Sequence, residues 1–199
     1  MGRFLKSELI LGGQRSGKSR RAEVLANGWL AESSQHRAVL IATATAWDNE
    51  MAQRIARHQQ DRAERVPGVL TVEAPLLLAQ ALQSHSQPHT LVVIDCLTLW
   101  LTNLMMPHKN AENSLLSTSN VPIAQQIRAQ SAMFLVALKA APGPVVIVGN
   151  EIGLGVIPMG RDTRAFVDTL GRLNQDVAAA CDRVTFMAAG LPLALKGKL

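Results

Sequence analysis

The chain has 199 residues, 48% of them hydrophobic and only 4% aromatic, which suits one domain with a sizeable buried core. Its formal net charge of +5 and pI of about 9.8 favour phosphate-bearing partners without choosing between nucleotides and nucleic acid. Two distant cysteines in apolar surroundings predict buried reduced thiols, and the chain shows neither a signal peptide nor an apolar stretch near the roughly twenty residues of a membrane span. These features argue against a disulfide-stabilised or membrane-spanning protein, and we expect a cytoplasmic one.

Short apolar runs alternate along the chain with longer segments of helical spacing. The runs are continuous and rich in leucine or β-branched residues, as expected for strands covered on both faces. They predict strands at residues 8–11, 38–43, 69–72, 90–95, 144–149 and 183–188. The longer segments predict helices at residues 18–32, 48–64, 75–83, 123–141 and 162–180. This alternation predicts an α/β fold with a mostly parallel sheet flanked by helices, in one domain spanning residues 1–199.

One segment departs from the alternation. Residues 105–122 are polar, rich in Asn and Ser, and weakly periodic. We expect this segment to be a flexible excursion from the domain.

The segment GGQRSGKS at residues 12–19 matches the phosphate-loop pattern G-x-x-x-x-G-K-[ST] in full. An apolar strand precedes it and a helix follows it, which is the context that the pattern requires. Glycines let backbone amides turn toward phosphate oxygens, Lys18 would reach the β- and γ-phosphates, and Ser19 would hold Mg²⁺. The nucleotide-binding residues predicted here are Leu11, Gly12, Gly13, Gln14, Arg15, Ser16, Gly17, Lys18 and Ser19.

A second magnesium ligand is expected at the end of another core strand. Asp95 follows four apolar residues, and the carboxyl ends of parallel strands lie on the ligand side of such sheets. Alternatively, Asp95 caps the helix that begins near Leu97. Glu73 follows its own apolar run in a similar way. Together these residues predict a Mg²⁺-dependent P-loop NTPase fold of the RecA-like kind.

Residues 48–65 read DNEMAQRIARHQQDRAER and place a single histidine, His58, among arginines. Glu50, Arg54 and His58 are spaced by four, so they share one face of the predicted helix. From this segment alone, a solvated helical histidine and a phosphate-directed nucleophile both remain open.

The order of four sequence blocks resembles one enzyme family. The blocks are GGQRSGKSRRAE, IATATAWDNEMAQRIARHQQDR, DCLTLWLTNL, and VGNEIGLGVIPMGRDTRAFVDTLGRLNQDVAAACDRV. They resemble the bifunctional adenosylcobinamide kinase and adenosylcobinamide-phosphate guanylyltransferase family of cobalamin biosynthesis. The likeness covers most of the chain, although residues 105–122 match nothing in it.

This resemblance implies two reactions, with ATP, GTP, adenosylcobinamide and adenosylcobinamide phosphate as ligands. The first phosphorylates the aminopropanol hydroxyl of adenosylcobinamide with ATP or GTP, and the second passes GMP from GTP through a guanylyl-histidine to give adenosylcobinamide-GDP. The resemblance implies that His58 carries the GMP, that Lys18 acts in catalysis, and that the enzyme is a homotrimer. It implies further nucleotide contacts by Ala42, Thr43, Ala44, Gln59, Gln60, Asp61, Arg62, Glu73 and Asp95.

Two further sets of residues each have two possible interpretations. The segment NEIGLGVIP at residues 150–158 either shapes the acceptor site or forms a structural turn. Four polar residues further on would meet phosphate or a neighbouring subunit: Arg161, Arg164, Arg172 and Asn174.

Two rival functions are another small-molecule P-loop kinase, with His58 incidental, and a RecA-like ATPase that binds nucleic acid. The basic residues are scattered and little interleaved with aromatic residues, which argues against nucleic acid as a partner.

Overall fold

A seven-stranded sheet forms the centre of the protein in the computed structural model, which describes residues 6–46, 48–106 and 121–199. Its strand order is β3-β2-β4-β5-β1-β6-β7. The strands are β1 (Ser7–Gly12), β2 (Arg37–Ala42), β3 (Leu70–Glu73), β4 (Thr90–Asp95), β5 (Val145–Val148), β6 (Arg183–Ala188) and β7 (Leu191–Lys196). Strands β1 to β6 pair in parallel and β7 is antiparallel to β6, which confirms the expected α/β class.

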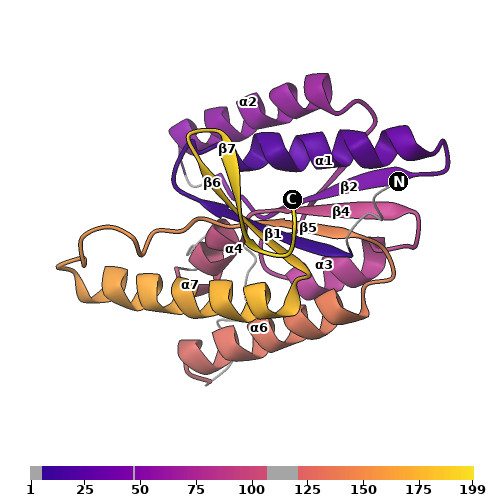
Figure 1. The fold of residues 1–199 in the computed structure, drawn as a ribbon. Coiled ribbons are helices and arrows are strands. Elements are labelled where there is room, and N and C mark those ends of the chain that lie inside the picture. Colours follow the sequence, from indigo (N-terminus) through magenta and orange to yellow (C-terminus); the bar gives the residue numbers. More distant parts are fainter. Residues whose placement is uncertain (1–5, 47, 107–120) are drawn as a thin grey trace.

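Helices cover both faces of this sheet (Figure 1). They are α1 (Lys18–Glu32), α2 (Asn49–Arg65), α3 (Leu78–His85), α4 (Leu97–Met105), α6 (Ile123–Ala140) and α7 (Arg161–Ala180). Helices α1 and α2 lie on one face, and the other four lie on the opposite face. None of the helices in the described part of the chain is long and apolar enough to cross a membrane.

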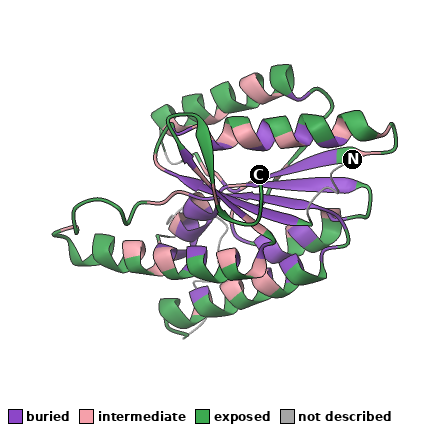
Figure 2. Ribbon diagram, viewed as in Figure 1, coloured by how far each residue is buried: buried purple, intermediate pink, exposed green. Residues whose placement is uncertain are grey.

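The continuous apolar strands contribute side chains to two hydrophobic cores, because successive side chains of a strand point to opposite faces of the sheet. Leu9 and Leu11 pack into the core under α3, α4, α6 and α7, whereas Ile10 packs with Ala22 and Ala26 of α1. Figure 2 shows the result: the central strands are buried, and the outward faces of the helices are exposed. Strand β3, expected to be covered on both faces, and strand β7 are largely exposed because they lie at the two edges of the sheet.

Helix α2 differs from the other helices because none of its residues is buried. Asp48 caps its start, with the side chain accepting a hydrogen bond from the Met51 amide at 2.7 Å. Glu50 adds a negative charge in the first turn, which complements the helix dipole. Figure 2 shows α2 as the outermost layer of its face.

Two elements differ from expectation. Helix α3 begins at Leu78 rather than at residue 75, because Trp100 Nε1 and Asn103 Nδ2 donate to the carbonyls of Leu76 and Pro75 and hold them outside the helix. Strand β7 was not predicted; it contains Pro192 and pairs at the sheet edge, where proline is tolerated. The expected excursion at residues 105–122 falls largely outside the described residues, which include only its first two and last two positions.

The carboxyl ends of the parallel strands meet at one edge of the sheet. In the strand order, β5 lies between β1, which leads into the phosphate loop, and β4, which ends at Asp95. Its residue Val148 is in register with Ile10 on one side and with Asp95 on the other. The elements expected to carry phosphate and metal are therefore adjacent to β5.

Candidate nucleotide site

The phosphate loop connects β1 to α1 through a tight turn. Gly12 and Gly17 have φ angles of 152° and 101°, a region that favours glycine. A Cβ atom on Gly12 would lie 2.5 Å from the Met187 carbonyl oxygen, so β6 also requires a glycine here. The loop ends at the start of α1, whose free amides and dipole suit an anion.

Lys18 extends back over this loop. Its ammonium donates to the Gly13 carbonyl at 2.6 Å, and the residue is only 8% exposed. Burial lowers the pKa of Lys18 because it disfavours the charged form, whereas Cys96 and Asp95 act in the opposite direction. A partly desolvated cation held within the loop is suited to bind phosphate oxygens.

Asp95 lies at the end of β4, as the sequence predicts. Its Oδ2 atom accepts from Arg62 Nη1 at 3.3 Å, so this carboxylate connects the sheet to α2. The alternative that Asp95 caps α4 is not supported, because Cys96 is the N-cap residue and no side-chain cap bond forms. The other carboxylate oxygen of Asp95 has no protein hydrogen bond among the described residues.

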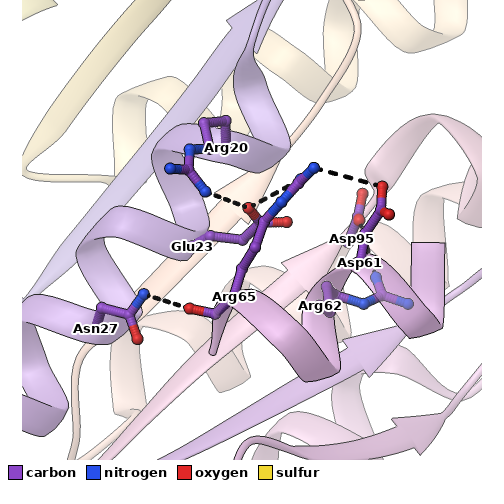
Figure 3. Close-up of polar contacts among 7 residues, drawn as sticks. All are labelled: Arg20, Glu23, Asn27, Asp61, Arg62, Arg65 and Asp95. Atoms are coloured by element: carbon purple, nitrogen blue, oxygen red, sulfur yellow. Dashed lines mark hydrogen bonds and ion pairs between the residues drawn. The ribbon is translucent and has the colours of Figure 1, made fainter. Parts of the chain in front are cut away.

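A small polar cluster holds the C-terminal end of α2 against α1 (Figure 3). Glu23 of α1, 7% exposed, pairs with Arg65 at 3.4 Å and with Arg20 at 3.7 Å. Asn27 Nδ2 donates to the Arg65 carbonyl at 2.7 Å. Together with the Arg62 contact, these interactions lie in the last turn of α2, and His58 lies outside that turn.

A cavity of about 730 Å³ opens between the phosphate loop, the strand ends and α2. Such a volume falls within the range of small-molecule sites. The cavity brings together most of the residues predicted from the sequence. Those lining it are Gln14, Arg15, Ser16, Gly17, Lys18, Ser19, Ala42, Ala44, His58, Gln59, Arg62, Glu73 and Asp95.

Other predicted contact residues lie outside the lining of this cavity: Leu11, Gly12, Gly13, Thr43, Gln60 and Asp61. Thr43 is fully buried, and its hydroxyl donates to the Cys96 carbonyl at 2.7 Å, so it braces the strand ends. Gln60 and Asp61 lie beside Glu64 and Arg65 of their own helix. Their direct contact with nucleotide stays a prediction.

The cavity also includes residues that were not among the predicted contacts. Helix α2 supplies Glu50, Met51, Gln53, Arg54, Ile55 and Arg57, and the rest are Arg20, Cys96, Leu99, Val148 and Asn150. The expected shared face of Glu50, Arg54 and His58 is confirmed, because these residues are spaced by four on one α-helix, and all three line the cavity. That four-residue spacing was the signal from which Glu50 and Arg54 could have been included.

The segment after β5 divides into a fixed part and an exposed part. Asn150 and Glu151 are held by backbone hydrogen bonds, whereas Leu154 and Val156 are 77% and 95% exposed. Arg164 donates to the carbonyls of Pro158 and Met159, and Asn174 is buried. None of Arg161, Arg164, Arg172 and Asn174 lines the cavity.

The two cysteines are free and buried, as the sequence predicts. Burial raises the pKa of both Cys96 and Cys181 to about 12. Neither thiol is therefore suited to act as a nucleophile, although Cys96 borders the cavity.

The parallel sheet, the glycine loop with Lys18, and the carboxylate at the end of β4 define a P-loop nucleotide-binding protein. A family model described as "Cobinamide kinase / cobinamide phosphate guanyltransferase" matches residues 8–195. The chain belongs to this family, and it is therefore a bifunctional kinase and nucleotidyltransferase. This membership sets aside both rival functions.

Relatives from two bacteria agree with this assignment. The chain is 44% identical over 192 residues to the bifunctional adenosylcobalamin biosynthesis protein CobP of Pseudomonas aeruginosa, covering 96% of this chain and 98% of that protein. It is 35% identical over 188 residues to the bifunctional adenosylcobalamin biosynthesis protein CobU of Escherichia coli, covering 94% and 98%.

Solved structures are more distant. The RadB recombinase has a TM-score of 0.45 and 14% identity, over 93% of this chain and 76% of that chain. The flagellar accessory protein FlaH from Methanocaldococcus jannaschii has a TM-score of 0.48 and 13% identity, over 96% and 78%. At this distance the likenesses carry no functional argument.

Proposed function

We propose that the enzyme phosphorylates the aminopropanol hydroxyl of adenosylcobinamide and then converts the product to adenosylcobinamide-GDP. The observation that carries the proposal is a single cavity lined by Lys18, Asp95 and His58. Phosphoryl transfer requires the first two residues, and a covalent nucleotidyl transfer requires a nucleophile such as the third.

In the kinase step, the hydroxyl oxygen of adenosylcobinamide attacks the γ-phosphorus of ATP or GTP. The bond from that phosphorus to the β–γ bridging oxygen breaks, the nucleoside diphosphate leaves with the electron pair, and the hydroxyl proton is released. Lys18 neutralises charge on the β- and γ-phosphates, and the loop amides position them.

In the guanylyl step, an imidazole nitrogen of His58 attacks the α-phosphorus of GTP and pyrophosphate leaves. A phosphate oxygen of adenosylcobinamide phosphate then attacks the same phosphorus, which releases the histidine and forms adenosylcobinamide-GDP. Arg15, Arg54 and Arg57 line the cavity and can neutralise the charge that develops on the α-phosphate. Dividing one displacement into two through a covalent intermediate lowers the barrier of each.

Mg²⁺ fits the residues of this site, with Ser19 and Asp95 as its protein ligands. Mg²⁺ usually takes one or two protein oxygens and completes its shell with water and phosphate, so it needs no larger cluster of carboxylates. Arg62 contacts only the Oδ2 atom of Asp95, which leaves the second oxygen for a cation. When bound, the ion would neutralise charge on the β- and γ-phosphates.

The proposal also includes a homotrimer in the cytoplasm, where ATP and GTP are supplied. The exposed apolar residues Ile152, Leu154, Val156, Ile157 and Met159 on one segment support a subunit contact. A neighbouring subunit at that segment would complete the acceptor side of the cavity.

Product analysis tests the proposed function. With adenosylcobinamide, GTP and Mg²⁺, mass spectrometry should detect the phosphorylated corrinoid first and adenosylcobinamide-GDP later. Lys18→Ala should reduce both products at least about a hundredfold if one phosphate site serves both steps. The absence of both products with the unaltered enzyme would contradict the proposal, and guanylylation unaffected by Lys18→Ala would indicate two separate phosphate sites.

A further inference from the structure

Asn150 lies between the two strands that carry phosphate and metal chemistry. It follows β5, which is paired to β1 on one side and to β4 on the other. Val148, two residues earlier, is in register with Asp95, and both Val148 and Asn150 line the cavity that contains Lys18. The sheet itself therefore places Asn150 between the lysine and the carboxylate.

Three hydrogen bonds from three different elements fix the backbone of this position. The Asn150 amide donates to Thr98 Oγ1 of α4 at 2.9 Å, and its carbonyl accepts from Asn174 Nδ2 of α7 at 3.1 Å. The amide of Glu151 donates to the Gly12 carbonyl at 3.1 Å. Thr98 and Asn174 are 9% and 4% exposed, so these anchors are themselves held by packing.

The part of the segment after β5 that these hydrogen bonds hold is short. Ile152 is already 40% exposed, and most of the apolar side chains that follow it are far more exposed. An ordinary turn between β5 and α7 would not need these anchors at its first residues. The fold thus restrains Asn150 in particular, as expected for a group held ready to meet a ligand.

Only the carboxamide of Asn150 remains available to a ligand. Its backbone amide and carbonyl are both engaged, whereas its side chain forms no hydrogen bond with the described residues. A carboxamide N–H donates to a phosphate oxygen without adding charge, which complements the cations already present. It therefore suits the contact to one phosphate group.

The location of Asn150 indicates which phosphate group its carboxamide would contact. The lysine of a phosphate loop reaches the β- and γ-phosphates, and Asp95 would hold a cation that neutralises their charge. The terminal phosphate consequently belongs between Lys18 and Asp95, where β5 ends.

We propose that Asn150 donates a hydrogen bond to the terminal phosphate of the bound nucleoside triphosphate, so that the site distinguishes triphosphate from diphosphate. Thr98 and Asn174 are positioning residues that hold its backbone. The inference rests on the proposed function, since it assumes that the cavity binds GTP or ATP. It assigns a role to the segment NEIGLGVIP beyond that of a turn.

Nucleotide binding, measured by calorimetry, tests this assignment. The ligands are a non-hydrolysable β,γ-imido analogue of GTP and GDP, each with Mg²⁺. Asn150→Ala should weaken binding of the analogue about tenfold, the effect of losing one hydrogen bond to a charged group, and leave GDP binding unchanged. Thr98→Val, which keeps the shape and removes the acceptor, should shift the ratio of the two affinities in the same direction but less.

Thr102→Val is the matched control. It makes the same change one turn further along α4, where the hydroxyl's one hydrogen bond within the described residues is to the Thr98 carbonyl. It should leave the ratio of the affinities unchanged, and melting temperatures should show that all variants fold.

Three results would overturn the inference. They are equal losses of both nucleotides in Asn150→Ala, equal effects of Thr98→Val and Thr102→Val, and unchanged nucleotide binding with a raised KM for adenosylcobinamide. None of these results would contradict the proposed function. Failure of the unaltered enzyme to bind either nucleotide would contradict both the inference and the proposed function.

Discussion

At the residue scale, the site separates groups that are free to react from groups that are held inert. His58 is exposed on α2 and lines the cavity, whereas Cys96 borders the same cavity with its thiol buried. Lys18 is buried within the phosphate loop, where desolvation lowers its pKa and strengthens its interaction with phosphate. The His58 imidazole, rather than the Cys96 thiol, is therefore the group that solvent and substrate can reach.

Cysteine reactivity tests this separation. Because burial raises the pKa of Cys96 and Cys181 to about 12, the thiolate fraction at mildly alkaline pH is far below that of a free cysteine. Iodoacetamide should therefore modify neither thiol in the folded enzyme, and both should react once denaturant unfolds it. Mass spectrometry of the alkylated protein provides the measurement, and rapid labelling of either thiol in the folded state would show that it is accessible.

At the element scale, α2 is the least anchored helix of the described fold. None of its residues is buried, and its described ties to the rest of the structure are polar contacts near its C-terminal end. A helix attached in this way can change its angle without exposing a hydrophobic core. The position of His58 relative to the phosphate loop therefore depends on Glu23, Asn27, Arg62 and Asp95.

Removing the charge of Glu23 should loosen α2. Glu23→Gln breaks the ion pairs with Arg65 and Arg20, which are partly exposed and together contribute on the order of 1 kcal/mol. We expect amide hydrogens of α2 to exchange several-fold faster, as measured by hydrogen–deuterium exchange. Glu32→Gln is the control, because Glu32 is exposed on the same helix α1 and has no ion pair among the described residues. Equal exchange in Glu23→Gln and the unaltered enzyme would show that other contacts hold α2.

Helices and strands with a local sequence pattern could be predicted, whereas contacts between residues far apart in the sequence could not. Continuous apolar runs predicted the parallel strands, and the glycine pattern predicted the phosphate loop. The pairing of Arg62 with Asp95 joins residues 33 positions apart, and it depends on how α2 packs across the sheet edge. The fixation of Asn150 similarly requires α4, α7 and β1 together, so no local pattern contains it.

At the scale of the whole molecule, the segment that follows β5 carries apolar surface that the described chain does not cover. Val156 and Met159 are each 95% exposed in that segment, which is unusual for apolar side chains of a single chain. A subunit contact would remove this surface from water.

Light scattering after size-exclusion chromatography tests the proposed homotrimer. The mass should be three times that of the 21.4 kDa chain. Val156→Asp places a charge in the proposed contact and should lower the mass, with the circular dichroism spectrum unchanged. A mass of one chain for the unaltered enzyme would exclude the trimer, and an unchanged trimer in Val156→Asp would place the contact elsewhere.

The most direct test of the account is the transfer of label from GTP to His58. The enzyme should retain radioactivity from GTP labelled at the α-phosphate, in a bond that is labile to acid and stable to base, as a phosphoramidate is. His58→Ala should retain none, yet it should still phosphorylate adenosylcobinamide, because the kinase step does not use the imidazole. Label retained by His58→Ala would contradict the central claim that this histidine carries the GMP.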